Sequence, residues 1–130
     1  KISINVGGSY GAGNYAMCGR GFDPRFLFSW PNSRTAVMGG AQAGMVLRIV
    51  AGAKMAKAGQ IDEAKLAALE QTTQVQMDSQ TTALASTARM EDDGLIDPRD
   101  TRRVLAYTLD ICRDADARTL RTNTFGIARF

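Results

Sequence analysis

The sequence predicts an α/β fold, and two similar segments carry this prediction. A run of β-branched residues, Ile2–Val6, leads into a glycine-rich turn (residues 7–13) and then into the start of a helix. About 25 residues later a second strand, Thr35–Met38, leads through Gly39 and Gly40 into another helix. Short strand and helix units that repeat at this spacing are typical of an α/β architecture.

Local patterns define the elements between these two units. Asn14 is expected to be the N-cap of the first helix, which runs from about Tyr15 to Gly19. The apolar run Phe26–Trp30 predicts a buried strand, which the turn formers of residues 31–33 bring to an end.

The C-terminal half is predicted to be mainly helical. The helix after Gly40 holds the most apolar run of the chain; its glycines and single arginine favour a buried helix that ends at Gly59 over a membrane span. Strong helix formers over residues 62–90 predict one long helix or two broken ones. Residues 97–98, Asp followed by Pro, mark the start of a last helix, and the apolar end of the chain, residues 125–130, is expected to be docked.

Composition bounds the kinds of chemistry that the chain can perform. Its 130 residues, 45% hydrophobic and 22% charged, suit one ordinary folded domain. Histidine is absent, which excludes histidine bases and histidine metal ligands within the chain. The two cysteines, Cys18 and Cys112, lie far apart and predict free thiols, as in a reducing cytosol. The acidic residues of segment 92–100 are better explained by turns and caps than by a metal site.

The glycine turn is the strongest candidate site. The backbone N–H groups of Ala12 and Gly13, beside a helix start, could form an oxyanion hole, although an ordinary tight turn has the same glycine spacing. Residues 1–40 carry four basic side chains and one acidic side chain, which suits an anionic ligand. Tyr15 could line a flat ligand site or belong to an aromatic core. Arg20 could bind an anion or pair with an acidic neighbour.

Three longer motifs resemble a known family. Residues 8–20 (GSYGAGNYAMCGR), 26–33 (FLFSWPNS) and 92–105 (DDGLIDPRDTRRVL) are similar to the C-terminal domain of the β subunits of biotin-dependent acyl-CoA carboxylases, the carboxyltransferases. The resemblance covers nearly the whole chain. The GAGNY form of the first motif resembles the branch that acts on 3-methylcrotonyl-CoA and geranyl-CoA.

This resemblance implies a fold and a place in a larger enzyme. The expected fold is crotonase-like, with β-β-α units wound into a superhelix. Residues 1–130 are then the biotin-facing, C-terminal portion of the carboxyltransferase C-domain, and a fragment of a longer β subunit. The acyl-CoA-binding residues of such enzymes lie outside the fragment, so that the fragment alone is expected to be inactive.

The resemblance also assigns site residues. In this family the C-domain holds an oxyanion hole for the ureido oxygen of biotin, and by position Ala12 and Gly13 match its two backbone amides. Gly11, Tyr15 and Phe28 are the expected biotin-binding residues, and no metal is implied. Oriented neutral donors of this kind suit a chain without histidine.

The reaction implied by the resemblance is transfer of a carboxyl group from carboxybiotin to the γ-carbon of a branched α,β-unsaturated acyl-CoA. Gly21 and Ala41 depart from the usual methylcrotonyl pattern. Geranyl-CoA, a substrate of acyclic terpene catabolism, is therefore favoured, with 3-methylcrotonyl-CoA of leucine catabolism as the alternative.

The expected holoenzyme is an ATP-dependent ligase. Its biotin is carried by an α subunit that also holds biotin carboxylase, and the β subunits assemble with it as α6β6. The expected compartment is the cytoplasm of a bacterium or the mitochondrial matrix of a eukaryote, without nucleic-acid or membrane partners.

Two other readings of the sequence remain open. A crotonase-fold hydratase or isomerase without biotin would need a carboxylate beside the oxyanion hole, and none is placed next to residues 11–13. A non-catalytic fragment that only assembles with partner subunits would use the apolar faces of the helices equally well.

Overall fold

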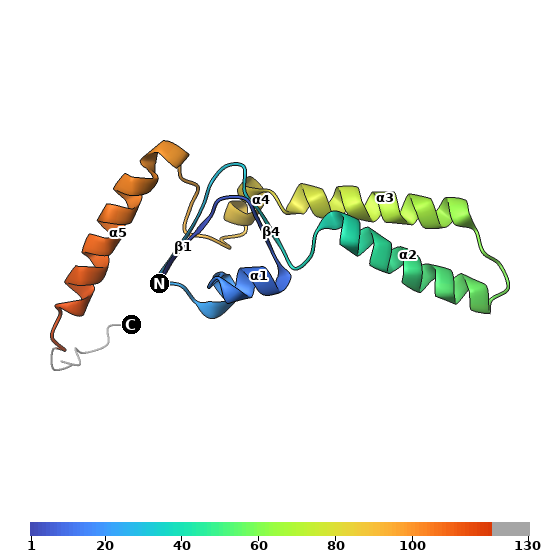
Figure 1. Ribbon diagram of the computed structural model, residues 1–130, viewed down its shortest axis with the longest axis horizontal. Coiled ribbons are helices and arrows are strands. Elements are labelled where there is room, and N and C mark those ends of the chain that lie inside the picture. The colour runs from blue at the N-terminus through green and yellow to red at the C-terminus, as the bar shows by residue number, and fades with distance from the viewer. Residues whose placement is uncertain (121–130) are drawn as a thin grey trace, which may run out of the picture. The chain divides into compact units, whose positions relative to one another are not determined.

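The structure, a computed structural model, describes residues 1–120. These residues fall into two compact units, residues 1–98 and a second unit that begins at Arg99. The first unit opens with two consecutive repeats, each made of two strands and a helix (Figure 1). In chain order their elements are β1 (Ile2–Asn5), β2 (Gly8–Tyr10), α1 (Gly11–Ala16), the 3-10 turn η1 (Arg20–Phe22), β3 (Phe26–Ser29), β4 (Arg34–Ala36) and α2 (Gly40–Lys57).

The strands of the two repeats pair with each other in parallel. In the first sheet Ile2 of β1 lies opposite Phe26 of β3, and in the second sheet Gly8 of β2 lies opposite Arg34 of β4. The partners are thus 24 residues apart in one sheet and 26 in the other. This register confirms the predicted repeat of about 25 residues.

Two later segments continue the same layers. The Asp93 and Ile96 amides bond to β3 at Leu27 O (2.7 Å) and Ser29 O (2.9 Å). Beside β4, the Thr35 amide donates to Thr81 O at 2.9 Å. Because β3 has neighbours on both sides, its side chains are among the best buried of the unit, with Leu27 only 2% exposed.

The start of α1 differs from the prediction. Three residues expected in the glycine turn, Gly8–Tyr10, form β2 instead, and α1 begins at Gly11 directly after it. Tyr10 is the N-cap and provides no side-chain cap, so the prediction that Asn14 caps the helix is wrong. The Asn14 side chain lies inside α1 and donates to Ser9 Oγ at 2.9 Å. Pairing with β4 extends the strand further than the glycine pattern suggests.

Helices α2 and α3 (Glu63–Gln80) form an antiparallel hairpin, in which they lie side by side (Figure 1). The helices approach closely at two glycines: a Cβ at Gly40 would lie 2.8 Å from Gln74 O, and a Cβ at Gly44 would lie 2.7 Å from Glu70 O. Helix α4 (Ala83–Ala88) follows, so residues 62–90 form two helices, as one of the two alternatives predicted.

The hairpin also carries an ion-pair cluster. Arg48 of α2 bonds to Glu70 at 2.8 Å and to Glu63 at 3.0 Å. The hydrogen bond that Arg48 donates to Glu70 is the main reason that the pKa of Arg48 is raised.

The prediction that α2 is buried is wrong for the described chain. Small residues pack one face of α2 against α3, whereas Met45, Ile49 and Val50 on the other face are 57%, 64% and 62% exposed. Only α3 covers α2 extensively within residues 1–120, because the hairpin extends away from the strands (Figure 1). No helix among the described residues combines the length and apolar character that a bilayer crossing needs.

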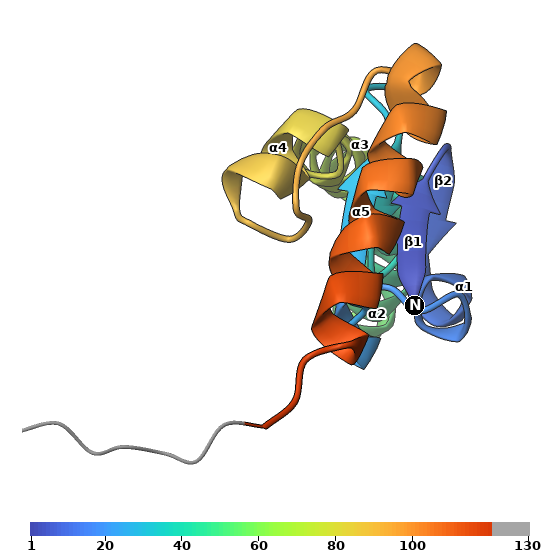
Figure 2. The same ribbon diagram turned by 90° about the vertical axis from the view of Figure 1, so that its left-hand side faces the viewer.

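The second unit is a single long helix after a short turn. The 3-10 turn η2 (Pro98–Asp100) leads into α5 (Thr101–Asp116), which Figure 2 shows as one continuous helix. The start predicted at residues 97–98 is confirmed, with a tighter first turn. The expected docked end, residues 125–130, lies outside the described residues.

Gly44 and Gly52 of α2 give a matched stability test. We expect Gly44→Ala to lower the free energy of unfolding by about 1–3 kcal/mol, because its methyl group would overlap the Glu70 carbonyl. Gly52→Ala should be neutral or stabilising by up to about 1 kcal/mol, because its methyl group meets only Leu66 Cδ1 at 3.6 Å. Thermal unfolding followed by circular dichroism measures both, and equal effects of the two changes would contradict the close packing at Gly44.

The N-cap of α3 gives a pH test. The Asp62 side chain accepts from the Lys65 amide at 3.1 Å, and this bond is the main cause that lowers the pKa of Asp62 below its ordinary value of 3.8. A lowered pKa means that the charged cap stabilises the fold above pH 3.8, and that the stabilisation is lost as the pH falls through the folded pKa. The wild type should therefore exceed Asp62→Asn in melting temperature at neutral pH and lose this advantage in acid. A difference that did not change with pH would contradict the assignment.

Candidate functional site

The site is built around the junction between β2 and α1. Gly11 has φ +50°, a conformation that glycine adopts without strain, and a Cβ at this position would lie 3.0 Å from Val37 O. Val37 directly follows β4. The glycine therefore lets the chain turn from strand to helix close against the end of the neighbouring repeat.

Ala12 and Gly13 occupy the next two positions of α1, and both are exposed. Amides in the first turn of a helix have no partner within the helix. Within residues 1–120 neither amide donates to backbone outside its own helix, and neither belongs to a strand ladder. The geometry thus provides two consecutive N–H donors that are available to a ligand.

A cavity of about 290 Å³ lies beside this junction, with walls from both repeats and from α3 and α4. Gly11 and Tyr15 line it, whereas Ala12 and Gly13 do not. Phe28 does not line it either: it is 8% exposed, and its ring stacks on that of Phe26 at 6.0 Å. The structure therefore brings Tyr15 and Gly11 to one cavity and places Phe28 elsewhere.

The Tyr15 ring rests on η1. It is half exposed, and it meets the Phe22 ring edge to face, with centroids 5.8 Å apart. A Cβ at Gly21 would lie 2.6 Å from Tyr15 Cε1. Gly21, whose departure from the methylcrotonyl pattern favoured geranyl-CoA, is thus small where the Tyr15 ring uses the space.

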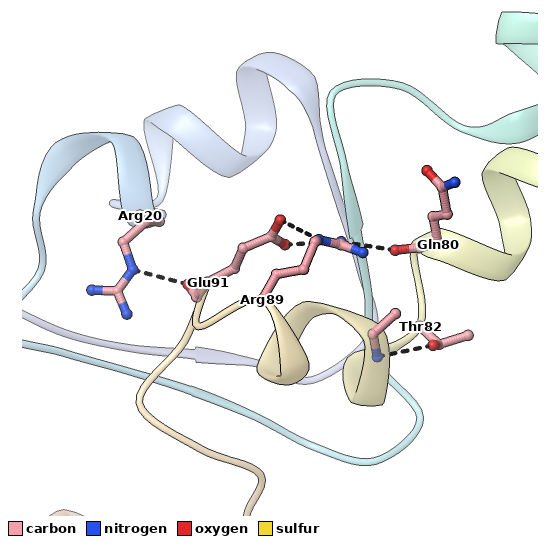
Figure 3. Close-up of polar contacts among 6 residues, drawn as sticks. Arg20, Gln80, Thr82, Arg89 and Glu91 are labelled. Atoms are coloured by element: carbon pink, nitrogen blue, oxygen red, sulfur yellow. Dashed lines mark hydrogen bonds and ion pairs between the residues drawn. The ribbon is translucent and has the colours of Figure 1, made fainter.

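A charged network forms another wall of the cavity (Figure 3). The Arg89 side chain donates to the Glu91 carboxylate at 2.8 and 3.2 Å and to Gln80 O at 2.9 Å. The hydrogen bond from Arg89 lowers the pKa of Glu91, and the same contact raises the pKa of Arg89. Arg20 Nε donates to Glu91 O at 2.9 Å. The backbone beneath is held by Thr82, whose Oγ1 caps α4 by accepting from the Ala85 amide.

The acidic segment after α4 serves the fold. Asp93 Oδ2 accepts from the Leu27 amide at 2.7 Å, and its other oxygen pairs with Arg20 at 3.5 Å. Arg20 thus has an acidic partner distant in sequence. Within residues 1–120 no three or more acidic or cysteine side chains gather in a way that could hold a metal ion.

Arg89 and Glu91 were not found from the sequence. They lie in a polar stretch without periodicity, and their partners come from α3 and η1. The sequence offered no motif or spacing that would have joined them to the glycine turn. Taken together, the site has two neutral N–H donors and, close by, a cavity with an aromatic wall, an arrangement suited to binding a planar group with an anionic oxygen.

Comparisons with known proteins identify the family and the fold of the chain. The carboxyl transferase domain family matches residues 1–125. A crystal structure of the geranyl-CoA carboxylase β subunit from P. aeruginosa is 63% identical with a TM-score of 0.88, over 100% of this chain and 24% of that one. A hexameric transcarboxylase 12S structure is 27% identical with a TM-score of 0.68, over 98% of this chain and 23% of that one.

A relative from Mycobacterium tuberculosis, a biotin-dependent 3-methylcrotonyl-coenzyme A carboxylase β1 subunit, is 48% identical over 88% of this chain and 22% of its own length. The chain thus spans about a quarter of the length of the proteins that it matches. These similarities confirm the crotonase-like fold expected from the motifs, and the chain belongs to the carboxyl transferase domain family.

Proposed function

We propose that this chain is the biotin-facing, C-terminal portion of the C-domain of a carboxyltransferase β subunit. The reaction is transfer of a carboxyl group from carboxybiotin to the γ-carbon of a branched α,β-unsaturated acyl-CoA. The observation that carries this proposal is the similarity to the geranyl-CoA carboxylase β subunit, at 63% identity over the whole chain. Geranyl-CoA is therefore the favoured substrate, with 3-methylcrotonyl-CoA as the alternative.

The residues present fit a biotin ring. Two adjacent amides, at Ala12 and Gly13, are exposed and have no partner outside their helix within the described chain. Tyr15 offers a half-exposed aromatic face next to them. Biotin, when bound, supplies the carboxyl group, and negative charge develops on its ureido oxygen as that group leaves.

The chain's own residues stabilise this charge. The Ala12 and Gly13 amides donate to the ureido oxygen, and as neutral donors they have no readily transferable proton to give up. Gly11 lets the backbone approach, since its positive φ turns the chain at the base of the helix. Tyr15 limits where the ring lies. Phe28, which does not line the cavity, is assigned to the biotin site by the family resemblance alone.

The complete enzyme requires more than this chain. We propose that an α subunit carries the biotin and the biotin carboxylase activity, and that the holoenzyme is an ATP-dependent ligase. The β subunits assemble with it as α6β6, in the bacterial cytoplasm or in the mitochondrial matrix. The acyl-CoA site belongs to other parts of the β subunit, and the chain alone is therefore inactive.

The substrate assignment is tested with the full-length β subunit and its α subunit. Carboxylation of geranyl-CoA and of 3-methylcrotonyl-CoA is measured in parallel with ATP and bicarbonate. We expect the higher kcat/KM with geranyl-CoA. A preference for 3-methylcrotonyl-CoA would select the alternative, and activity on neither would exclude both and favour a role in assembly alone.

The oxyanion hole is tested by removing one donor without a change in the side-chain chemistry around it. Ala12→Pro deletes an N–H, and proline is tolerated in the first turn of a helix. We expect it to lower kcat by about 100- to 1000-fold, the usual cost of one lost oxyanion donor. Gly7→Ala lies outside the site and keeps its N–H, and its methyl group would enter open space, so it serves as the control with near-normal activity. Full activity of a folded Ala12→Pro enzyme would rule out the Ala12 amide as a donor.

A further inference from the structure

The turn η1, which packs against the Tyr15 ring, is bonded to a segment about 70 residues later in the chain. Arg20 begins η1, and its guanidinium reaches the loop after α4 through Glu91 O at 2.9 Å (Figure 3). It also pairs with Asp93 Oδ1 at 3.5 Å. These are the only recorded side-chain contacts of Arg20 within the described residues. The η1 segment is also joined to α1, since the Gly19 amide donates to Asn14 O at 2.8 Å, and Arg20 adds the side-chain link from η1 to this loop.

The loop itself is held firmly. Asp93 bonds to Leu27 of β3 through its carboxylate and through its amide, each at 2.7 Å. Glu91 is held by Arg89, which also bonds to the end of α3 at Gln80 O. Because Arg89 occupies the Glu91 carboxylate, the Glu91 carbonyl oxygen is the group that receives Arg20. A single side chain thus transmits the position of a fixed loop to η1.

The contact between η1 and the Tyr15 ring is so close that it leaves no space for an added side chain. Gly21 directly follows Arg20, and its Cα lies so close to the ring that even a methyl group would be 2.6 Å from Cε1. Phe22, the last residue of the same turn, meets the ring edge to face. A shift of η1 therefore moves both surfaces that orient the Tyr15 ring toward the cavity.

We propose that Arg20 is a positioning residue for biotin, which fixes η1 to the Glu91–Asp93 loop and thereby sets the Tyr15 ring at the biotin site. This inference rests on the proposed function, in which Tyr15 borders biotin. Arg20 does not touch the reacting atoms in this assignment. Its loss should therefore weaken the use of biotin and leave the use of the acyl-CoA unchanged.

The test separates the two substrates of the transfer. The full-length β subunit, assembled with an α subunit that lacks biotin, moves the carboxyl group from the carboxylated acyl-CoA to free biotin. In this direction the carbon–carbon bond breaks, a nitrogen–carbon bond forms on biotin, and the proton from that nitrogen passes to the γ-carbon. The KM for biotin and the KM for the acyl-CoA are measured separately.

We expect Arg20→Gln to raise the KM for biotin about tenfold with little change in the KM for the acyl-CoA, since small misplacements of positioning groups have effects of this order or larger. Arg25→Gln is the matched control. Arg25 is an exposed arginine nearby with the same charge, and only its backbone makes a recorded contact. Gly21→Ala leaves Arg20 intact but displaces the ring, and should raise the KM for biotin in the same way.

Combination with Tyr15→Leu distinguishes this inference from the proposed function. If Tyr15→Leu raises the KM for biotin and Arg20→Gln adds nothing to it, both are supported. If Tyr15→Leu raises it and Arg20→Gln does not, the positioning role is overturned while the site assignment stands. If Tyr15→Leu has no effect, the assignment of Tyr15 fails, and the inference fails with it. Should Arg20→Gln fail to fold, Arg20→Lys, which keeps the charge but lacks the Nε donor to Glu91 O, decides the question.

Discussion

The parallel pairing of β2 with β4 is the interaction on which the site depends. It brings the ends of two strands from successive repeats together, and α1 starts directly after one of them. At Gly11 an added Cβ would lie 3.0 Å from Val37 O, and this tight contact together with the positive φ favours glycine. The first amides of α1 are thereby placed at an edge formed by both repeats, rather than on an isolated turn.

The second constraint is the close approach of η1 to the Tyr15 ring, and its origin lies far away in the sequence. The loop after α4 pairs with β3 like a further strand of the sheet, and it carries the acceptors for Arg20. Within this loop the Glu91 carboxylate pairs with Arg89, and the main-chain carbonyl of Glu91 accepts the long-range hydrogen bond from Arg20. The sheet and the polar loop thus act together on the position of η1, against which the Tyr15 ring packs.

Many element positions could be predicted from hydrophobic periodicity and from turn and cap residues. The β-branched run of β1, the end of α2 before Gly59 and the start of the last helix at residues 97–98 are local signals, and each was predicted close to its observed place. The start of α1 was missed because pairing with a distant strand made Gly8–Tyr10 extended, and no local pattern records that partner. The exposure of α2 was missed because a mainly apolar composition does not show how many of its faces have neighbours.

The sequence pointed to individual residues of the candidate site, but it did not show how they are arranged in space. Ala12, Gly13 and Tyr15 were identified from the glycine turn and the family motifs, whereas Arg89 and Glu91 depend on contacts that no spacing reveals. Gly21 shows the same limit: its small size was noticed, but the structure was needed to show that the Tyr15 ring uses the space.

In the proposed site the Ala12 and Gly13 amides hold the ureido oxygen of biotin. An experimental structure of the full-length β subunit with biotin bound would test this arrangement. We expect both amide nitrogens about 2.7–3.1 Å from that oxygen, with the Tyr15 ring beside the bicyclic ring. Biotin bound elsewhere, or both amides bonded to other protein groups while biotin is bound, would contradict it.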